Sequence, residues 1–175
     1  MPTIMSHAAV PIAGALVLGH GRLTTAVVAT GIVLAMLPDL DVIGFGMGIE
    51  YGEAWGHRGA SHSLLVAAIC GLLAAALLRP AHFKTVALYL FTCMASHGIL
   101  DAFTNGGLGA ALLWPFDDAR YFAPYRPVEV SPIGNSFFTG RGLAVLWSEF
   151  FTIWLPLAGF VVLVLAMKRV LARQE

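Results

Sequence analysis

Five apolar runs, each ended by glycine, proline or a charged residue, constrain this chain more than any other feature of its sequence. They cover residues 8–18, 23–37, 63–78, 85–100 and 143–167. A run of about sixteen residues forms a helix of about 24 Å, slightly shorter than the hydrocarbon core of a bilayer, which is about 30 Å thick. The pattern predicts an all-α, polytopic integral membrane protein of about five short helices, forming a single domain over residues 1–175.

The composition agrees with a membrane protein and excludes several other classes. The chain is 58% hydrophobic and only 11% charged, whereas an average soluble domain is about 25% charged. Its ten basic and ten acidic residues balance, so we expect no nucleic-acid partner. Cys70 and Cys93 lie inside apolar runs, where a thiol packs as a small hydrophobe. Two such cysteines predict neither a disulfide framework nor a thiolate zinc site.

The distribution of charge predicts an orientation in the membrane. Five spans in series place nearly all carboxylates on one face, with the loops at 38–62 and 102–142, the second of which is rich in Gly, Pro and aromatic residues and predicts a packed cap. The opposite face receives basic residues, which favours the cytoplasm; they are Arg22, Arg79, Lys84, Lys168, Arg169 and Arg173. We expect a multi-pass protein of the bacterial inner membrane whose carboxylate-rich face is periplasmic.

Histidine and aspartate residues gather at the ends of the runs on this outer face. His97 and Asp101 are four residues apart, so on a helix their side chains can meet at one point. His20 and His82 fall on the inner face instead. The candidate metal ligands are therefore His7, Asp39, Asp41, His57, His62, His97 and Asp101.

Imidazole and carboxylate ligands favour zinc, with manganese and iron as alternatives. Seven candidates allow one or two ions, and two would suit phosphoester chemistry. Asp41 or Asp39 could act as a general base, and Arg58 could stabilise developing negative charge; neutralising Asp39 or Asp41 is the alternative role of Arg58. All these residues could instead be helix caps, turn carboxylates and interfacial histidines. Ionisable groups near hydrocarbon raise the free energy of the folded protein and are by default functional. This favours the metal site.

Four motifs together resemble a known family. They are Ser6-His7, Leu37-Pro38-Asp39-Leu40-Asp41, the segment HRGASHS from His57 to Ser63, and the segment SHGILDAFT from Ser96 to Thr104. In combination they are similar to the bacterial inner-membrane-bound, metal-dependent hydrolases, some of which are under SOS control, and the likeness covers most of the chain up to Phe116. The resemblance implies a helical membrane hydrolase whose metal is held by the matching His and Asp positions. The spacing of His97 and Asp101 is also similar to the zinc-dependent phospholipase C group, although the further ligand-bearing helix of that group has no clear counterpart here.

We therefore expect a membrane-bound, metal-dependent hydrolase that acts on a membrane lipid or a lipid-linked or membrane-proximal ester. A phosphoester is favoured, as in a phospholipase or phosphatase, with a metal-activated water as the attacking group. The alternative is a metal-binding transporter or sensor without hydrolytic activity, although transporter sites usually lie near the bilayer midplane. Glu149 could face the site or bond to a neighbouring helix, and Ser61 and Ser63 are expected to cap the third helix.

Overall fold

The structure, a computed structural model, describes residues 1–132 and 137–174. Within these ranges every regular element is helical, and the bridges Thr104–Val128 and Ala110–Tyr121 are isolated. The elements are α1 (Ile4–His7), α2 (Ala9–Leu18), α3 (Thr25–Met36), the 3₁₀-helix η1 (Leu37–Val42), α4 (Ile43–Gly46), the 3₁₀-helix η2 (Ala60–His62), α5 (Leu64–Leu78), α6 (Phe83–Ala102), α7 (Gly140–Glu149), the π-helix η4 (Phe150–Trp154) and α8 (Leu155–Leu171).

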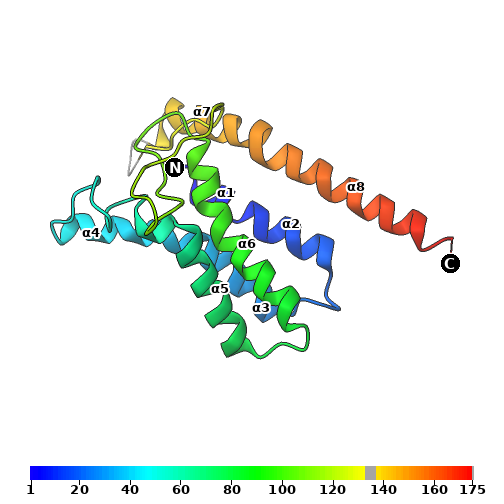
Figure 1. Ribbon diagram of the computed structural model, residues 1–175. Coiled ribbons are helices and arrows are strands. Elements are labelled where there is room, and N and C mark those ends of the chain that lie inside the picture. The colour runs from blue at the N-terminus through cyan, green and yellow to red at the C-terminus, as the bar shows by residue number, and fades with distance from the viewer. Residues whose placement is uncertain (133–136, 175) are drawn as a thin grey trace.

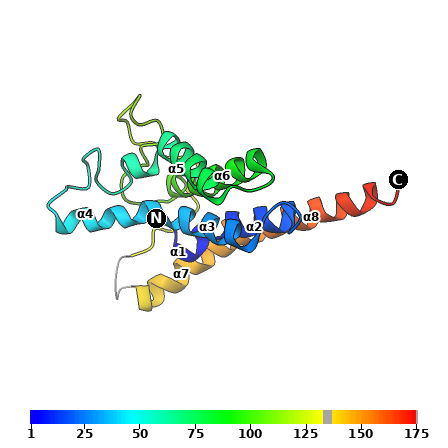
Figure 2. The ribbon, with the colours of Figure 1, turned by 90° about the horizontal axis from the view of Figure 1, so that it is seen from below.

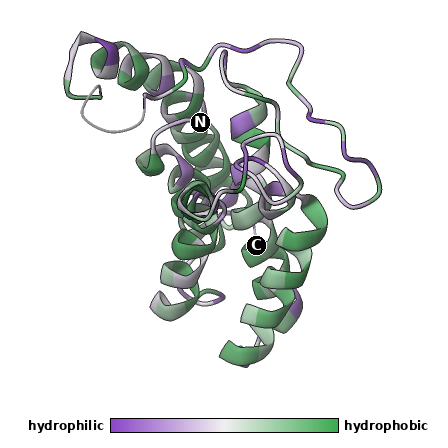
Figure 3. Cartoon of the chain, turned by 90° about the vertical axis from the view of Figure 1, so that its left-hand side faces the viewer, coloured by the Kyte–Doolittle hydropathy of each residue, from purple (hydrophilic) through white to green (hydrophobic). Residues whose placement is uncertain are grey.

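The predicted all-helical membrane architecture is confirmed. Three helical stretches are long and apolar enough to cross a membrane, at Thr25–Gly46, Phe83–Ala102 and Gly140–Leu171, and two shorter apolar helices lie at Ile4–Leu18 and Leu64–Leu78. Many large apolar side chains point outward, as Leu77 does with 83% of its surface exposed. Figure 3 shows that the helices are largely hydrophobic, whereas hydrophilic residues gather in the loops. This surface suits a lipid surrounding.

The core forms around α6, which packs against α5 and α3 (Figure 1). Leu90 and Val86 of α6 are fully buried there. Gly71 lets α5 approach α6 closely, because a Cβ at that position would lie 2.6 Å from the backbone nitrogen of Phe91. Tyr89 ties α2 to the same core through a 3.0 Å hydrogen bond from its hydroxyl to the carbonyl of Pro11. The central helix is thus held from three sides.

The helix of the second apolar run, 23–37, does not end at Pro38 as the sequence predicts. It continues through η1 and α4 to Gly46, because Pro38 occupies the first turn of the 3₁₀-helix, where a missing N–H leaves no bond unmade. The expected loop at 38–62 is therefore shorter. As a consequence, Asp39 and Asp41 lie on a helical segment and not in a flexible turn.

The last helical stretch leans away from the others (Figures 1 and 2), and α8 packs mainly against α2. The sequence predicts a kink at Pro156. The irregular turn lies immediately before it, in the π-helix Phe150–Trp154, where proline cannot donate a hydrogen bond to the carbonyl four residues earlier. Only 11% of the residues in the most apolar 18-residue segment of this stretch are buried against the rest of the protein.

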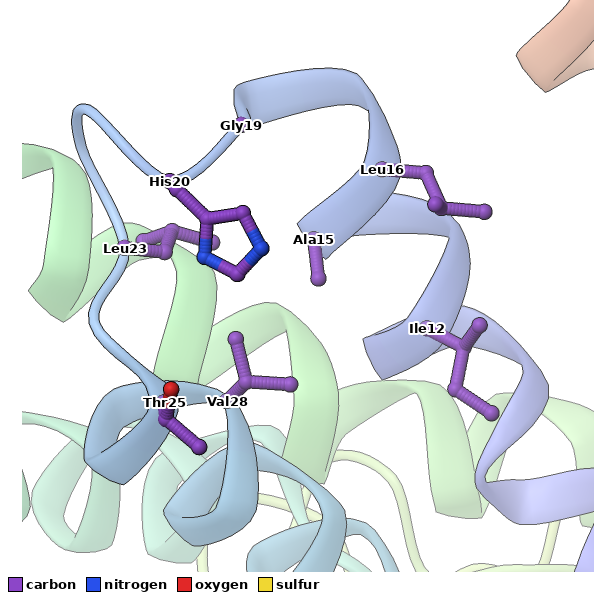
Figure 4. Close-up of a pocket in the computed structure, with 8 residues that line it drawn as sticks. All are labelled: Ile12, Ala15, Leu16, Gly19, His20, Leu23, Thr25 and Val28. Carbon is purple, nitrogen blue, oxygen red and sulfur yellow. The ribbon is translucent and has the colours of Figure 1, made fainter.

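The two long loops pack on each other at one end of the molecule. The guanidinium of Arg120 donates to the carbonyl oxygens of His57 at 2.7 Å, Glu53 at 2.8 Å and Tyr51 at 3.1 Å. Trp55 and Trp114 meet edge to face. These contacts agree with the packed cap that the aromatic content predicts. At the other end, His20 lines an apolar pocket of about 290 Å³ between α2 and α3 (Figure 4).

Candidate metal centre

Four buried side chains from three helical elements meet at the loop-covered end of α6. His97 and Asp101 come from α6, Asp39 from η1 and His62 from η2. One ligand atom from each lies within 4.8 Å of all the others. Asp39 is 8% exposed, and the other three are 2% exposed or less. The i, i+4 pair that the sequence predicts is therefore half of the cluster.

The hydrogen bonds of the two histidines determine which ring nitrogens carry protons. His97 Nδ1 lies 2.7 Å from the carbonyl oxygen of Ala35, which can only accept, so Nδ1 is protonated. His62 Nδ1 lies 3.0 Å from Ser61 Oγ, and that hydroxyl already donates to Asp41 at 2.7 Å. His62 Nδ1 is therefore also a donor. This assignment follows from the network, and it leaves both Nε2 atoms with lone pairs.

These lone pairs face each other and the nearby carboxylates. His97 Nε2 and His62 Nε2 are 3.0 Å apart. His97 Nε2 is 3.3 Å from Asp39 Oδ1, and His62 Nε2 is 3.3 Å from Asp101 Oδ2. Apart from these 3.3 Å contacts with the two histidines and an ion pair between Asp101 and Arg58, the oxygens of Asp39 and Asp101 have no hydrogen-bond partner in the described part of the chain. Converging buried acceptors need a cation between them, and two imidazoles with two carboxylates are a ligand set that suits a divalent metal.

A proton can take the place of that cation. Burial lowers the pKa of His62, but hydrogen bonds to Asp101 and Asp41 outweigh burial and raise the pKa above its usual value. A protonated His62 can donate from Nε2 to its acceptor neighbours. The cluster is therefore built to hold positive charge at this point.

Local sequence explains how His62 reaches α6. Gly98 lies between the two ligands of that helix, and a Cβ there would come within 2.5 Å of the carbonyl oxygen of His62. Ser63 then starts α5 as predicted, since its hydroxyl accepts from the backbone N–H of Val66 at 3.2 Å. Ser61 does not cap that helix as expected, and donates to Asp41 instead. Glycine on α6 and serine at the cap thus fix the position of the loop ligand.

His7 joins the cluster from the amino-terminal side. Its ring is fully buried and stacks on the ring of His97 with centroids 3.7 Å apart. His7 Nε2 lies 3.8 Å from Asp101 Oδ1. Neither ring nitrogen has a hydrogen-bond partner among the described residues. His7 therefore offers a further nitrogen ligand at the edge of the four-residue group.

Asp41 and His57 lie together on the loop side of the cluster. Asp41 Oδ1 is 2.6 Å from His57 Nδ1, and Asp41 Oδ2 accepts from Ser61 Oγ and from the backbone N–H of Arg58 at 3.1 Å. Asp41, His57 and His62 form a second group with metal-ligand spacing. His57 also lines a cavity of about 220 Å³ with Tyr51 and Arg58. Both oxygens of Asp41 are thus engaged by protein donors.

Arg58 is placed differently from the prediction. Its side chain is fully buried, and Nε lies 3.0 Å from Asp101 Oδ2. The remaining guanidinium nitrogens donate to the carbonyls of Gly106 and Leu108 at 3.1 and 2.7 Å and to Thr104 Oγ1 at 3.1 Å. Arg58 has a φ of 63°, a left-handed conformation that non-glycine residues seldom adopt. The guanidinium therefore has little capacity left for an anionic substrate, and it neutralises Asp101 where sequence reasoning pointed to Asp39 or Asp41.

All seven predicted ligands thus come together at one end of the helices, and the two excluded histidines do not join them. His20 lies between α2 and α3, and His82 precedes α6 at the end opposite to Asp101. Sequence reasoning missed the carbonyl of Ala35 and the hydroxyl of Thr104, which orient His97 and Arg58. Backbone carbonyls give no sequence signal. Thr104 lies only three residues after Asp101, which is the signal that could have identified it.

Comparison with known proteins supports a membrane family. The family described as YdjM inner membrane protein matches residues 1–172. The chain is 41% identical over 160 residues to the inner membrane protein YbcI of Escherichia coli (strain K12), covering 89% of this chain and 92% of that protein. No solved structure matches. The expected inner-membrane relationship is confirmed at the level of the family.

Proposed function

The chain belongs to the YdjM inner membrane protein family, and from that premise we propose that it is a metal-dependent hydrolase acting on a membrane lipid or lipid-linked ester. A phosphoester is the favoured substrate. The observation that carries the proposal is the 3.0 Å approach of two imidazole nitrogens, both with lone pairs, beside Asp39, which has no hydrogen-bond partner among the described residues, and Asp101, whose charge Arg58 offsets. Such a group of acceptors is unfavourable unless it holds a cation.

Asp39, His62, His97 and Asp101 would hold the ion, with His7 beside them. A divalent cation supplies Lewis acidity there, making water more acidic and drawing electrons from an ester oxygen. Zinc is favoured by the mixed nitrogen and oxygen ligands, with manganese and iron as alternatives and room for one or two ions. The other ligand group, Asp41, His57 and His62, would hold a second ion only with His62 Nδ1 free of its proton.

The residues around the ion can then be given roles. Asp39 is the better general base, because its oxygens have no hydrogen-bond partner in the described structure, whereas those of Asp41 are occupied. In a site with one ion, Asp41 orients His57 and His62 through their Nδ1 atoms. His57 lines the neighbouring cavity, and because its Nδ1 donates to Asp41, its Nε2 can accept a proton from the attacking water and then pass it to a leaving group. Arg58 holds Asp101 in place.

A metal sensor or transporter is the second candidate. The burial of all four ligands favours it, because a catalytic metal site keeps a coordination position open to substrate, whereas a closed site does not. The position of the cluster at one end of the helices favours the enzyme, since transporter sites usually lie at the bilayer midplane. Hydrolytic turnover separates the two.

The deciding experiment measures metal and activity on the same preparation. Protein purified in mild detergent is analysed for transition metals and then screened for phosphate release from lipid classes, with and without chelator. We expect a stoichiometric ion and chelator-sensitive release that returns when zinc or manganese is added. A preparation that neither contains metal nor takes it up would contradict the proposed site, and metal without turnover would favour the sensor.

A further inference from the structure

Glu149 is a buried carboxyl group that the proposed chemistry does not use. It ends α7, inside the last helical stretch, and is 1% exposed. It accepts hydrogen bonds from the backbone N–H of Thr3, from Thr3 Oγ1 at 2.7 Å and from Ser6 Oγ at 2.7 Å. No Lys, Arg or His side chain in the described residues forms an ion pair with it. A buried acid is unfavourable in a membrane helix and marks a function by default.

The π-helix that follows Glu149 brings a second group to the same hydroxyl. Trp154 Nε1 donates to Ser6 Oγ at 2.9 Å. Glu149 and Trp154 are five residues apart: Glu149 directly precedes the π-helix Phe150–Trp154, and Trp154 ends it. In a π-helix the backbone hydrogen bonds join residues five apart, whereas in an α-helix they join residues four apart. Turns of this kind occur often at functional sites. Both contacts of Ser6 therefore depend on this irregular turn.

The next residue in the chain is His7, whose ring has no hydrogen bond to orient it. Among the described residues the buried ring stacks on His97 and lies 3.8 Å from Asp101. A metal-ligating histidine usually has its second ring nitrogen oriented by a hydrogen bond. Here the backbone of α1 is oriented instead, through Thr3 and Ser6, and the ring follows.

We propose that Glu149 is a positioning residue of the metal centre, which acts through Ser6 on His7. This inference rests on the proposed metal site. It makes the last helical stretch part of the centre: its π-turn clamps the amino-terminal segment so that the imidazole of His7 stays over His97, next to Asp101. The alternative is that the same hydrogen bonds serve only to pack α7 against α1.

A double-mutant cycle separates these roles. The zinc affinity of detergent-solubilised protein is measured by competition with a chromophoric chelator for the parent, Glu149→Leu, His7→Ala and the double variant. Leucine keeps the bulk and removes both acceptor oxygens. We expect Glu149→Leu to weaken zinc binding by about 10-fold to 100-fold, as loss of an orienting group does. In the His7→Ala background the same change should have less than about a twofold effect.

Two further variants keep the test independent of folding. Ser6→Ala removes the hydroxyl that bonds to both Glu149 and Trp154 but leaves the bonds of Thr3 to Glu149, so it should reproduce part of the loss and its dependence on His7. Glu149→Gln retains one acceptor oxygen and should bind zinc more tightly than Glu149→Leu. Thr152→Val is the matched control, because that hydroxyl donates only to Ser148 O within the same helix at 2.6 Å; it should bind zinc as the parent does.

Three results would overturn the inference. Unchanged zinc affinity in Ser6→Ala and Glu149→Leu would overturn this inference and leave the proposed metal site standing. An equal loss in the parental and His7→Ala backgrounds would show that Glu149 serves packing only. A parent that binds no zinc, manganese or iron would overturn the proposed site together with this inference.

Discussion

At the scale of single residues, the cluster depends on charge and lone pairs more than on shape. Asp101 has contacts with His62, His7 and Arg58, so it is the charge at the middle of the site. His97 has its tautomer fixed by the carbonyl of Ala35. Changes that keep size but alter charge or lone pairs should therefore affect metal binding far more than insertion of the helices.

Asp101→Asn and His97→Ala should each lower metal affinity by more than about 100-fold, beyond the effect of losing an orienting group. Elemental analysis and chelator competition measure this, and the apolar surfaces that insert the helices are untouched. His20→Asn is the control, since His20 lies in the pocket between α2 and α3 (Figure 4), and it should behave as the parent does. Full metal content in both cluster variants would show that the pair only packs.

Zinc affinity should fall as the pH is lowered. The pKa of His62 is raised, because hydrogen bonds to Asp101 and Asp41 outweigh burial, so this imidazole is protonated at a higher pH than usual. Zinc needs the neutral ring, so a proton competes with it below that pKa, and affinity should drop about tenfold per pH unit there. Titration from about pH 8 to pH 5, with proton release measured on adding zinc, checks this. An affinity independent of pH would contradict it.

At the scale of helices and loops, the close contact of α6 with the His62 loop is the feature most sensitive to a small change. Gly98→Ala places a methyl group 2.5 Å from the carbonyl oxygen of His62. Overpacking of this kind costs about 1–3 kcal/mol. It should displace His62 and weaken metal binding without removing any ligand. Gly159→Ala, on α8 with nothing within 4 Å of its Cβ, is the control and should leave metal affinity unchanged.

The same scale shows what a sequence can and cannot predict. Apolar runs predict the helices, and the i, i+4 spacing predicts that His97 and Asp101 meet. The continuation past Pro38 was missed, because proline is read as a stop although the first turn of a 3₁₀-helix tolerates it. The exact partner of Arg58 could not be predicted, since Asp39, Asp41 and Asp101 carry the same carboxylate. Only the packing of the loop that carries Arg58 against α6 brings Arg58 to Asp101.

The role of Glu149 depended on the same kind of long-range contact. Its partners Thr3 and Ser6 are more than 140 residues away in the chain. A threonine or serine in the sequence does not by itself predict such a bond. Sequence reasoning left two roles open for Glu149, facing the site or bonding to a neighbouring helix. The structure shows hydrogen bonds to the amino-terminal segment, directly beside a candidate ligand.

At the scale of the whole molecule, the orientation in the membrane remains a prediction from the basic residues. Single cysteines at the exposed positions Ala54 and Ala119, in a background without Cys70 and Cys93, should react with an impermeant thiol reagent in intact cells. Glycines of the same loops, such as Gly48 and Gly107, are less suitable for cysteine because their positive φ values disfavour a side chain. A cysteine at His82 should stay unlabelled, and its labelling in place of the other two would invert the topology.

The length of the last helical stretch has a consequence for the membrane itself. Its apolar part, residues 143–167, is about 38 Å long at 1.5 Å per residue, whereas the hydrocarbon core is about 30 Å thick. A helix that is too long tilts, and a thinner bilayer tilts it further. Because Glu149 and Trp154 join this helix to Ser6, such a tilt pulls on the segment that carries His7.

Bilayer thickness should therefore affect the metal affinity of the centre. In vesicles of phosphatidylcholines with increasing acyl-chain length, the zinc affinity of the parent should change with thickness, while Ser6→Ala, which has lost the bond to Trp154 and one of the bonds to Glu149, should respond less. Equal responses of the two proteins would show that the helix tilts freely. A mechanical connection of this kind would let a protein made largely of apolar helices sense the state of the lipid layer around it.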